Sequence, residues 1–314
     1  MKRKYHPIKS EILKYSKRKP GQKLALWLFP FAMLTIQLSC VPEDLLIEVA
    51  PAKPQMVISS QVIPGGTMVV FVTRSFSALE GNDDSLSSAF LDKIIVENAE
   101  ASITFNGTEE LLEPIEDVAG IYVSDSGLDF ENSEIRLDVF DPSTNESIHA
   151  TTRVLPRISP DSVAFFEHIE DKDTVHSIYF SFTDPQDIDN WYALNVFDPE
   201  SFAEGISSNP LSFVGEDNGT FYEELITDQL FEKPVFEKTI ELEELIRSDT
   251  IAFLFTNISE GYFRFLDSRQ RTGGIISSAT SEPINHPTNI VGGLGYFNAQ
   301  NPSVKFASKT DQKD

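Results

Sequence analysis

From Gln55 onward, short runs of β-branched and aromatic residues alternate with turn residues, and this pattern predicts a mainly β fold. The strongest hairpin signal is Asn106-Gly107, which directly follows one such run. A later stretch has apolar residues at every second position, at Ile135, Leu137 and Val139. About seven strands are expected within residues 55–156, which indicates an immunoglobulin-like β-sandwich. The cysteine pair typical of such sandwiches is absent, so packing alone must hold the sheets.

A second β-rich domain is expected over residues 160–307, after a segment, 156–160, that begins and ends with proline. Its strands are interrupted by a long loop at 198–220, which is rich in Asn, Ser, Pro and Gly. Ser259 is expected to cap a short helix, so the domain should contain one or two short helices. The polar tail, 308–314, is predicted to be frayed.

The first 39 residues have the pattern of an export signal. Nine basic residues precede Leu24, and a mostly apolar run extends from there to Leu38. That run is too short for a permanent membrane helix and suits the core of a signal peptide. Ser39 and then Cys40 follow the run, and Cys40, the one cysteine of the chain, has no partner for an internal disulfide. The pattern resembles a lipobox, in which the peptide bond before the cysteine is cut and the thiol is acylated. The alternatives are a signal anchor with a free thiol and a buried cysteine.

The residues after Cys40 are expected to tether the body to a membrane. Residues 40–54 contain three prolines and little periodicity, as linkers do. Glu43 and Asp44 resemble the signal that sends lipoproteins of the Bacteroidota to the cell surface. We therefore expect residues 1–39 to be removed and the protein to be anchored in the outer membrane through lipid on Cys40, facing the cell surface.

The body that follows the signal is strongly acidic. The chain has 25 Lys and Arg against 49 Asp and Glu, and loss of residues 1–39 removes nine bases and one acid, leaving a formal charge of −32. Such a field repels nucleic acid and anionic lipid headgroups, so neither is an expected partner. Solubility at a crowded surface is the favoured explanation of this charge. Attraction of cations or of a basic partner is the second.

Two groups of side chains have the composition of metal sites. Asp184, Asp187, Asp189 and Asn190 offer closely spaced oxygens for calcium, but the Gly and the distal Glu of an EF-hand are missing. Ordinary turn chemistry is favoured for these four residues.

The second group surrounds a predicted hairpin turn and has the residue types of a zinc site: His168, Glu170, Asp171, Asp173 and His176. If the strands pair around Lys172, the two histidines lie roughly opposite each other. Solvated hairpin residues are favoured, because acidic residues cluster throughout the chain. No metal or cofactor is therefore predicted.

No catalytic motif is present in the sequence. The Gly292–Gly295 run lacks the Lys-Ser/Thr of a phosphate-binding loop, and a tight turn with close backbone packing is favoured. The body has four His and no G-x-S-x-G, H-E-x-x-H or C-x-x-C. Carboxylate pairs for glycoside hydrolysis stay open, because acidic residues are abundant. We predict a non-enzymatic protein with no catalytic residues.

Several stretches together resemble a Bacteroidota domain-of-unknown-function family of outer-membrane lipoproteins, with patterns F-x-D-P, N-Y-Y and a closing S-E-P and N-I-x-G-G-L-G-x-F. The stretches are Phe182-Thr183-Asp184-Pro185, Asn190-Trp191-Tyr192, Asp228-Gln229-Leu230-Phe231, Ser281-Glu282-Pro283 and Asn289 to Phe297. Trp191 replaces the more usual Tyr. The resemblance covers essentially all of residues 40–307, and it implies an outer-membrane lipoprotein that is often encoded near a TonB-dependent receptor.

This resemblance leads to three functional hypotheses. The first is an accessory partner of a TonB-dependent receptor, which captures ligand or covers the mouth of the barrel. The second is a stand-alone structural or adhesive surface protein, and the third is a carbohydrate-active hydrolase. For the first, the expected contact residues are the 198–220 loop and the aromatic residues Trp191, Tyr192 and Phe221.

Overall fold

The computed structural model divides the chain into two units, residues 1–50 and 51–314. The structure describes residues 53–61, 66, 68–76, 93–115, 118–124, 133–170, 173–186, 188–199, 220–231, 233–242, 246, 248–271 and 286–311. The predicted signal peptide, Cys40 and most of the 198–220 loop lie outside the described residues. Within these ranges, no helix is both long and apolar enough to cross a membrane.

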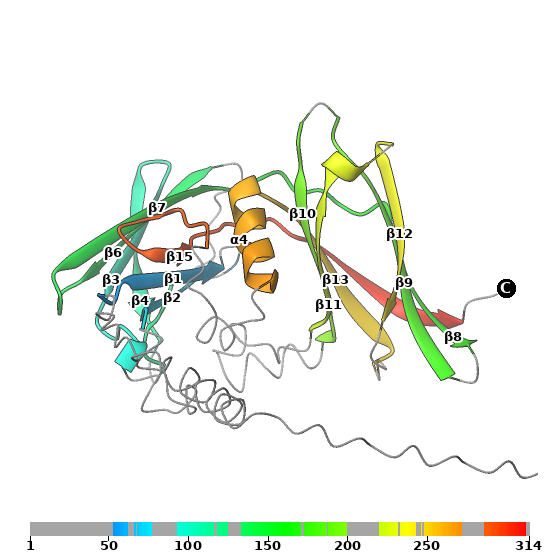
Figure 1. Cartoon of the computed structure of the whole chain (residues 1–314), viewed down its shortest axis with the longest axis horizontal. Coiled ribbons are helices and arrows are strands. Elements are labelled where there is room, and N and C mark those ends of the chain that lie inside the picture. Colours follow the sequence, from blue (N-terminus) through cyan, green and yellow to red (C-terminus); the bar gives the residue numbers. More distant parts are fainter. Residues whose placement is uncertain are drawn as a thin grey trace, which may run out of the picture. The chain divides into compact units, whose positions relative to one another are not determined.

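Nine of the described strands hydrogen-bond into a first sheet (Figure 1). In spatial order they are β14 (Ile290–Val291), β7 (Glu146–Arg153), β6 (Glu134–Asp141), β3 (Glu100–Phe105), β4 (Thr108–Pro114), β5 (Ile121–Val123), β2 (Val69–Arg74), β1 (Met56–Gln61) and β15 (Leu294–Tyr296). In β6, Ile135, Leu137 and Val139 are buried, whereas the residues between them are exposed or half-buried. The predicted mainly β class is confirmed, and the sheets form nearly closed, barrel-like sandwiches.

The hairpin between β3 and β4 turns at the two residues that the sequence indicated. Phe105 and Thr108 are opposite each other, so that Asn106 and Gly107 alone form the loop. Their φ angles are 49° and 77°, both in the left-handed region that a tight two-residue hairpin requires. Asn and Gly tolerate this backbone better than other residues, which is why the signal was readable from the sequence.

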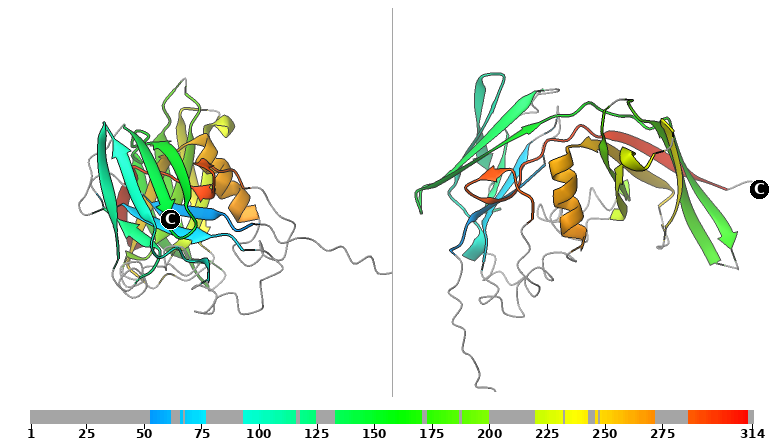
Figure 2. Two further views of the ribbon diagram at one scale, coloured as in Figure 1. Left: turned by 90° about the vertical axis from the view of Figure 1, so that its left-hand side faces the viewer. Right: turned by 45° about the horizontal axis from the view of Figure 1, so that its top comes forward.

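The first sheet is closed by a segment from the far end of the chain. β14 pairs with β7 at one edge, and β15 pairs in parallel with β1 at the other. Figure 2 shows this segment, in orange-red, among the strands of the first sheet. Gly295 has a φ of 89°, and a Cβ there would lie 2.0 Å from the carbonyl oxygen of Ile58. The two backbones can therefore approach only because the residue has no side chain.

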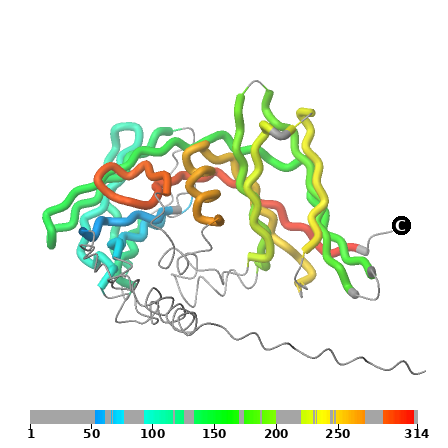
Figure 3. The backbone as a smooth tube through the Cα atoms, viewed as in Figure 1, coloured from blue at the N-terminus to red at the C-terminus, as the bar shows by residue number. Residues whose placement is uncertain are grey.

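Seven of the strands in the described ranges form a second sheet. In spatial order they are β11 (Thr220–Thr227), β10 (Trp191–Phe197), β13 (Thr250–Ile258), β16 (Ser303–Asp311), β8 (Ser162–Glu170), β9 (Asp173–Thr183) and β12 (Val235–Leu242). β16, red in Figure 3, is antiparallel to β13 along its first part and parallel to β8 along its last part. It therefore joins the two halves of the sheet.

The prediction of a frayed tail from Ser308 was wrong as far as Asp311. Ser308 pairs with Thr250 of β13, and Lys309 pairs with Phe165 of β8. The backbone of this polar segment is ordered by strand pairing, and the Lys309 ammonium lies 5.9 Å from the centre of the Phe165 ring. The polar composition of this segment gave no signal for a strand, because its pairing depends on the neighbouring backbone and not on apolar side chains.

The inner face of the second sheet is built from aromatic rings. The ring centres of Phe182 and Phe255 are 4.5 Å apart, and those of Tyr192 and Phe255 are 5.0 Å apart. Phe180 lies 5.2 Å from Phe253 in the same cluster. These separations are those of favourable aromatic pairs, which fill much volume with few side chains.

The division of strands between the sheets does not follow the order of the sequence. β14 and β15 lie within the predicted second domain, 160–307, but both pair with strands of the first sheet. Two of the connections between the sheets, β7 to β8 and β15 to β16, are joined by a side chain. The Arg157 guanidinium donates two hydrogen bonds, of 2.9 and 2.7 Å, to Asn301 Oδ1. Strand pairing over this sequence distance has no local signal.

One α-helix lies wholly within the described residues, α4 (Glu260–Arg271), which follows β13 directly. As predicted, Ser259 caps it: its hydroxyl oxygen accepts a hydrogen bond from the backbone N–H of Tyr262 at 3.3 Å. The ring of Tyr262 lies 5.3 Å from that of Tyr296 in β15. The helix therefore contacts the strand that closes the first sheet.

Candidate functional site

A buried carboxylate and a tyrosine hydroxyl meet at the end of β9. Asp184 is 7% exposed, and Tyr192, on β10, the next strand in the sequence, is 0% exposed. The Tyr192 hydroxyl donates a hydrogen bond to Asp184 Oδ1. Burial, together with the adjacent carboxylate, raises the pKa of Tyr192. Burial also raises the pKa of Asp184, an effect that the tyrosine hydrogen bond opposes and that nearby Asp228 reinforces.

Asn190 connects this carboxylate to the short 3₁₀ helix η2 (Asp228–Leu230). Its backbone N–H donates to Asp228 Oδ2 at 2.6 Å, and its carbonyl accepts from the Asp228 N–H at 3.2 Å. Its side-chain amide donates to the carbonyl of Ile188 at 2.8 Å. The turn between β9 and β10 is thereby held against the segment that follows β11.

Asp184 and Asp228 line a pocket of about 310 Å³, which we call the acidic pocket. Three acids, Asp184, Asp189 and Asp228, and one base, Lys233, are its charged residues, and Phe231 is among its apolar ones. One oxygen of Asp228, Oδ1, is buried without a hydrogen-bond donor. A carboxyl group with a raised pKa beside a pocket is typical of functional sites, so the acidic pocket is the candidate site.

The chain matches the model of one protein family over residues 43–305; the family is described as Domain of unknown function (DUF4249). The chain belongs to this family. The sequence resemblance to a domain-of-unknown-function family is therefore confirmed. A comparison of this DUF4249 chain with curated proteins finds no match.

Solved structures give only distant likenesses to the DUF4249 chain. They include E. coli alpha-2-macroglobulin (16% identity, TM-score 0.21, 68% of this chain and 14% of that one). A second is Salmonella alpha-2-macroglobulin reacted with methylamine (12% identity, TM-score 0.21, 71% of this chain and 15% of that one). A third is Bacteroides uniformis beta-glucuronidase 3 (11% identity, TM-score 0.20, 66% of this chain and 23% of that one). The chain spans less than a quarter of each of these proteins. TM-scores this low support no argument about fold or function.

Three of the stretches on which the DUF4249 resemblance rests meet at the acidic pocket. Asp184 and Pro185 come from the first, Asn190 from the second, and Asp228 and Phe231 from the third. They are separated by up to about forty residues in the sequence, and hydrogen bonds between turns bring them together. Nothing in the sequence indicates that these three stretches are neighbours.

The glycine-rich closing stretch of the DUF4249 chain has a structural role. Asn289 accepts from the backbone N–H of Phe297 at 2.9 Å and donates to its carbonyl at 2.8 Å, which closes the loop that contains β14 and β15. Phe297 is buried in the first core. The favoured interpretation of Gly292–Gly295, a tight turn with close backbone packing, agrees with this geometry.

The aromatic residues predicted to contact a partner differ in their exposure. Trp191 is half-buried, and Phe221 is half-buried against the second core. Tyr192 is fully buried, so its side chain is not available for surface contact. It is in phase with Leu194 and Val196 along β10, both of them in the core, and this alternation was the signal for an inward direction.

The oxygens considered for calcium are partly committed to turn contacts. Asp184 Oδ1 accepts from Tyr192, and Asn190 uses its side-chain amide as a donor to Ile188. Asp187 lies outside the described residues. Within the described ranges, no group of three or more His, Cys, Asp and Glu side chains is arranged to hold a metal ion.

The hairpin between β8 and β9 is present, but its register separates the two histidines considered for zinc. Glu167 is opposite His176, and His168 is opposite Val175. Since successive strand residues point to opposite faces, His168 and His176 lie on opposite faces of the sheet. The hypothesis that both hold zinc was therefore wrong. Glu170 pairs with Asp173, whereas pairing around Lys172 would put residue 174 opposite Glu170, and this difference of one residue in register changes the face.

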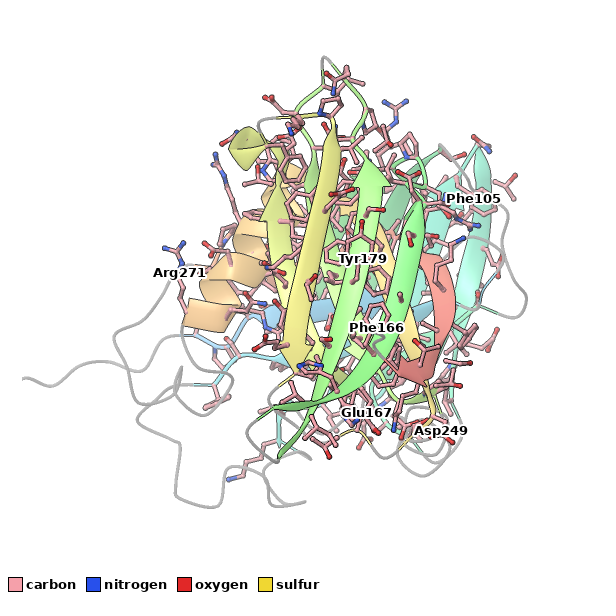
Figure 4. The ribbon with its side chains drawn as sticks, turned by 90° about the vertical axis from the view of Figure 1, so that its right-hand side faces the viewer. Phe105, Phe166, Glu167, Tyr179, Asp249 and Arg271 are labelled. Carbon is pink, nitrogen blue, oxygen red and sulfur yellow. The ribbon has the colours of Figure 1, made fainter. Side chains whose placement is uncertain are left out.

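His176 has a structural role instead. It is 2% exposed, its Nδ1 accepts from the Ile246 N–H at 3.0 Å, and its Nε2 lies 3.0 Å from Glu167. Hydrogen bonds from His176 and then Lys309 hold the pKa of Glu167 below its usual range. Figure 4 shows Glu167 and Asp249 at the same end of the second sheet, where Lys309 lies within 3.3 Å of the first and 3.7 Å of the second.

Proposed function

We propose that this DUF4249 protein is a lipid-anchored outer-membrane lipoprotein that faces the cell surface and serves a TonB-dependent receptor, by capturing ligand or by covering the mouth of its barrel. The observation that carries the proposal is Cys40, the single cysteine, placed directly after a basic segment and a short apolar run. Each buried CH₂ of an acyl chain contributes about 0.8 kcal/mol, so several chains on Cys40 give a stable anchor.

Binding is favoured over hydrolysis by the way the carboxylates are held. Asp184 is buried and accepts from Tyr192 and, at 3.5 Å, from the Asn190 amide. A general acid in glycoside hydrolysis has to deliver its proton to the substrate, and a carboxyl engaged by two protein donors is poorly placed for this. The polar residues of the family stretches hold turns together, which leaves the surface and the acidic pocket for recognition.

The anchor is tested by labelling cells with a palmitate analogue. The wild-type protein should be labelled and recovered in the outer-membrane fraction, while a Cys40→Ala variant should carry no label. Protease added to intact cells should degrade the wild-type protein if it faces outward. Label retained on the Cys40→Ala variant would exclude lipidation at this residue.

The partner is tested by purifying the native lipoprotein from outer membranes in mild detergent and identifying co-purifying proteins by mass spectrometry. A TonB-dependent receptor in near-equal amount supports the accessory role. Recovery of the lipoprotein alone favours a stand-alone structural or adhesive surface protein.

The contact surface is tested with Trp191→Ala, compared with Phe306→Ala as a control. Phe306 is a 68% exposed aromatic residue on β16, outside the predicted contact set. Trp191→Ala should reduce receptor recovery while Phe306→Ala leaves it unchanged, provided that both variants keep the wild-type melting temperature. Equal recovery with both variants would exclude Trp191 from the interface.

A further inference from the structure

The described part of the chain begins beside the segment that closes the first sheet. Lys53 is the first described residue, and β1 follows it almost directly. β15 runs parallel to β1, with Leu294 opposite Val57 (Figure 1). Gly292 lines a pocket of about 290 Å³ together with Lys53. The segment Val291–Leu294, which we call the closing loop, therefore lies where the predicted tether joins the body.

Two apolar side chains of the closing loop are exposed. Val291 is 58% exposed and Leu294 is 37% exposed. Ile290, the residue before Val291, is buried in the first core, so Val291 points away from that core. Leu294 is opposite Val57, whose two neighbours along β1 belong to the core, so these two side chains also point outward. Helix α4 contacts the other end of β15, at Tyr296, and Leu294 stays exposed.

The charged side chains at this end of the body pair with one another. Lys53 Nζ lies 2.6 Å from one carboxylate oxygen of Glu146, and the Arg74 guanidinium lies 3.2 Å from the other. Arg74 also pairs with Asp141. Two bases therefore balance two acids in this cluster, although the whole chain has a formal charge of −24. The excess of acids that is expected to repel anionic headgroups is thus not found in these ion pairs.

The length of the tether keeps this end of the body close to the membrane. Cys40 and Lys53 are 13 positions apart in the sequence. A flexible chain of this length has a mean end-to-end distance of about 20 Å, and its fully extended length is about 45 Å. With lipid on Cys40, a surface beside Lys53 meets the bilayer at a high effective concentration.

The size and charge of the closing loop favour lipid over a protein partner. Two exposed side chains are a much smaller patch than the roughly 800 Å² per partner that a stable protein interface buries. A lipid surface requires no matching shape. The closing loop contains only valine, glycine and leucine, so its contact with lipid removes no charge from water.

We propose that the closing loop rests on the lipid surface in which Cys40 is anchored, with the side chains of Val291 and Leu294 at the boundary between headgroups and acyl chains. Contact there removes apolar surface from water, as it does for interfacial helices. This inference rests on the proposed lipid anchor and assigns the side of the body that faces the membrane.

A fluorescent label on the mature lipoprotein tests this contact. Val291→Cys provides one thiol for an environment-sensitive dye, because lipid occupies the thiol of Cys40 in the proposed mature protein. Ile169→Cys, at a 78% exposed aliphatic residue on β8 of the second sheet, is the matched control. In phosphatidylcholine vesicles with nitroxide-labelled acyl chains, the dye of Val291→Cys should lose about half of its emission, and the dye of Ile169→Cys should keep its emission.

A second substitution tests whether the apolar side chains make the contact. Adding Leu294→Glu to the Val291→Cys variant should reduce the quenching at least twofold, because a carboxylate is costly to remove from water. Adding Leu111→Glu, at a 66% exposed leucine on β4, should leave the quenching unchanged. A melting curve for each variant shows whether it is folded.

The inference is overturned if the dye of Val291→Cys is not quenched, if both dyes are quenched equally, or if Leu294→Glu has no effect in a folded variant. Flotation with the vesicles and mass spectrometry of Cys40 measure the anchor separately. A lipidated protein that floats without quenching refutes this inference alone. Absence of lipid on Cys40 refutes the anchor and this inference together.

Discussion

Substitution of Gly295 by alanine should open the closure of the first sheet. A φ of 89° is unfavourable for alanine by about 1–3 kcal/mol. The new Cβ would also lie 2.0 Å from the Ile58 carbonyl oxygen, whereas Cβ atoms in proteins essentially never lie within 3.0 Å of such an atom. β1 and β15 would have to separate, which weakens their three paired positions, each hydrogen bond contributing about 1 kcal/mol. The expected loss in unfolding free energy is about 3–5 kcal/mol.

Gly107→Ala is the matched control for this experiment. Its φ of 77° is similarly unfavourable, but nothing lies within 4 Å of the added Cβ, so the expected loss is only about 1–2 kcal/mol. Urea unfolding of both variants, followed by tryptophan fluorescence and circular dichroism, gives the two free energies. The difference between them isolates the close contact of β15 with β1. Equal losses would refute the reasoning.

Three further predictions concern the second sheet. Deleting residues 308–314 should destabilise the protein, because β16 loses its pairing with β8, whereas deleting 312–314 should leave the melting temperature unchanged. Lys238→Val should change stability by less than about 1 kcal/mol but increase self-association in size-exclusion chromatography, because an inward charge on an edge strand, here paired with Glu224 at 2.5 Å, deters strand pairing between molecules. Arg136→Val, at a position paired with strands on both sides, is the control and should elute like the wild type. Asp184 has a raised pKa, so its contribution to stability is present below that pKa and is lost as the pH rises through it. The wild type should therefore gain stability relative to Asp184→Asn as the pH falls from neutral, and urea unfolding at several pH values measures this; a constant difference would contradict it.

Features that depend on nearby residues were predictable from the sequence. The turn at Asn106-Gly107 follows from the φ angles that these two residue types tolerate. The inward direction of Ile135, Leu137 and Val139 follows from their alternation, and the cap at Ser259 from its hydroxyl. Each depends on an interaction spanning a few residues, so a short stretch of sequence contains all the information required.

Small errors in local geometry were enough to change a predicted site. The strands around the β8–β9 turn were correctly expected, yet a difference of one residue in register put His168 and His176 on opposite faces. Alternation along β10 was available in the sequence, but Tyr192 was still interpreted as a surface residue. Its burial is decided by the sheet face that β10 turns toward the aromatic core.

Only the tertiary structure decided which distant segments meet. The parallel pairing of β15 with β1 joins residues more than 230 positions apart, and the acidic pocket unites Asp184 with Asp228. The sequence by itself determined the strand type and the tight turns, because propensity and backbone angles belong to adjacent residues. Strand partners depend on which backbone groups remain unpaired and which apolar faces remain uncovered once the whole chain is folded.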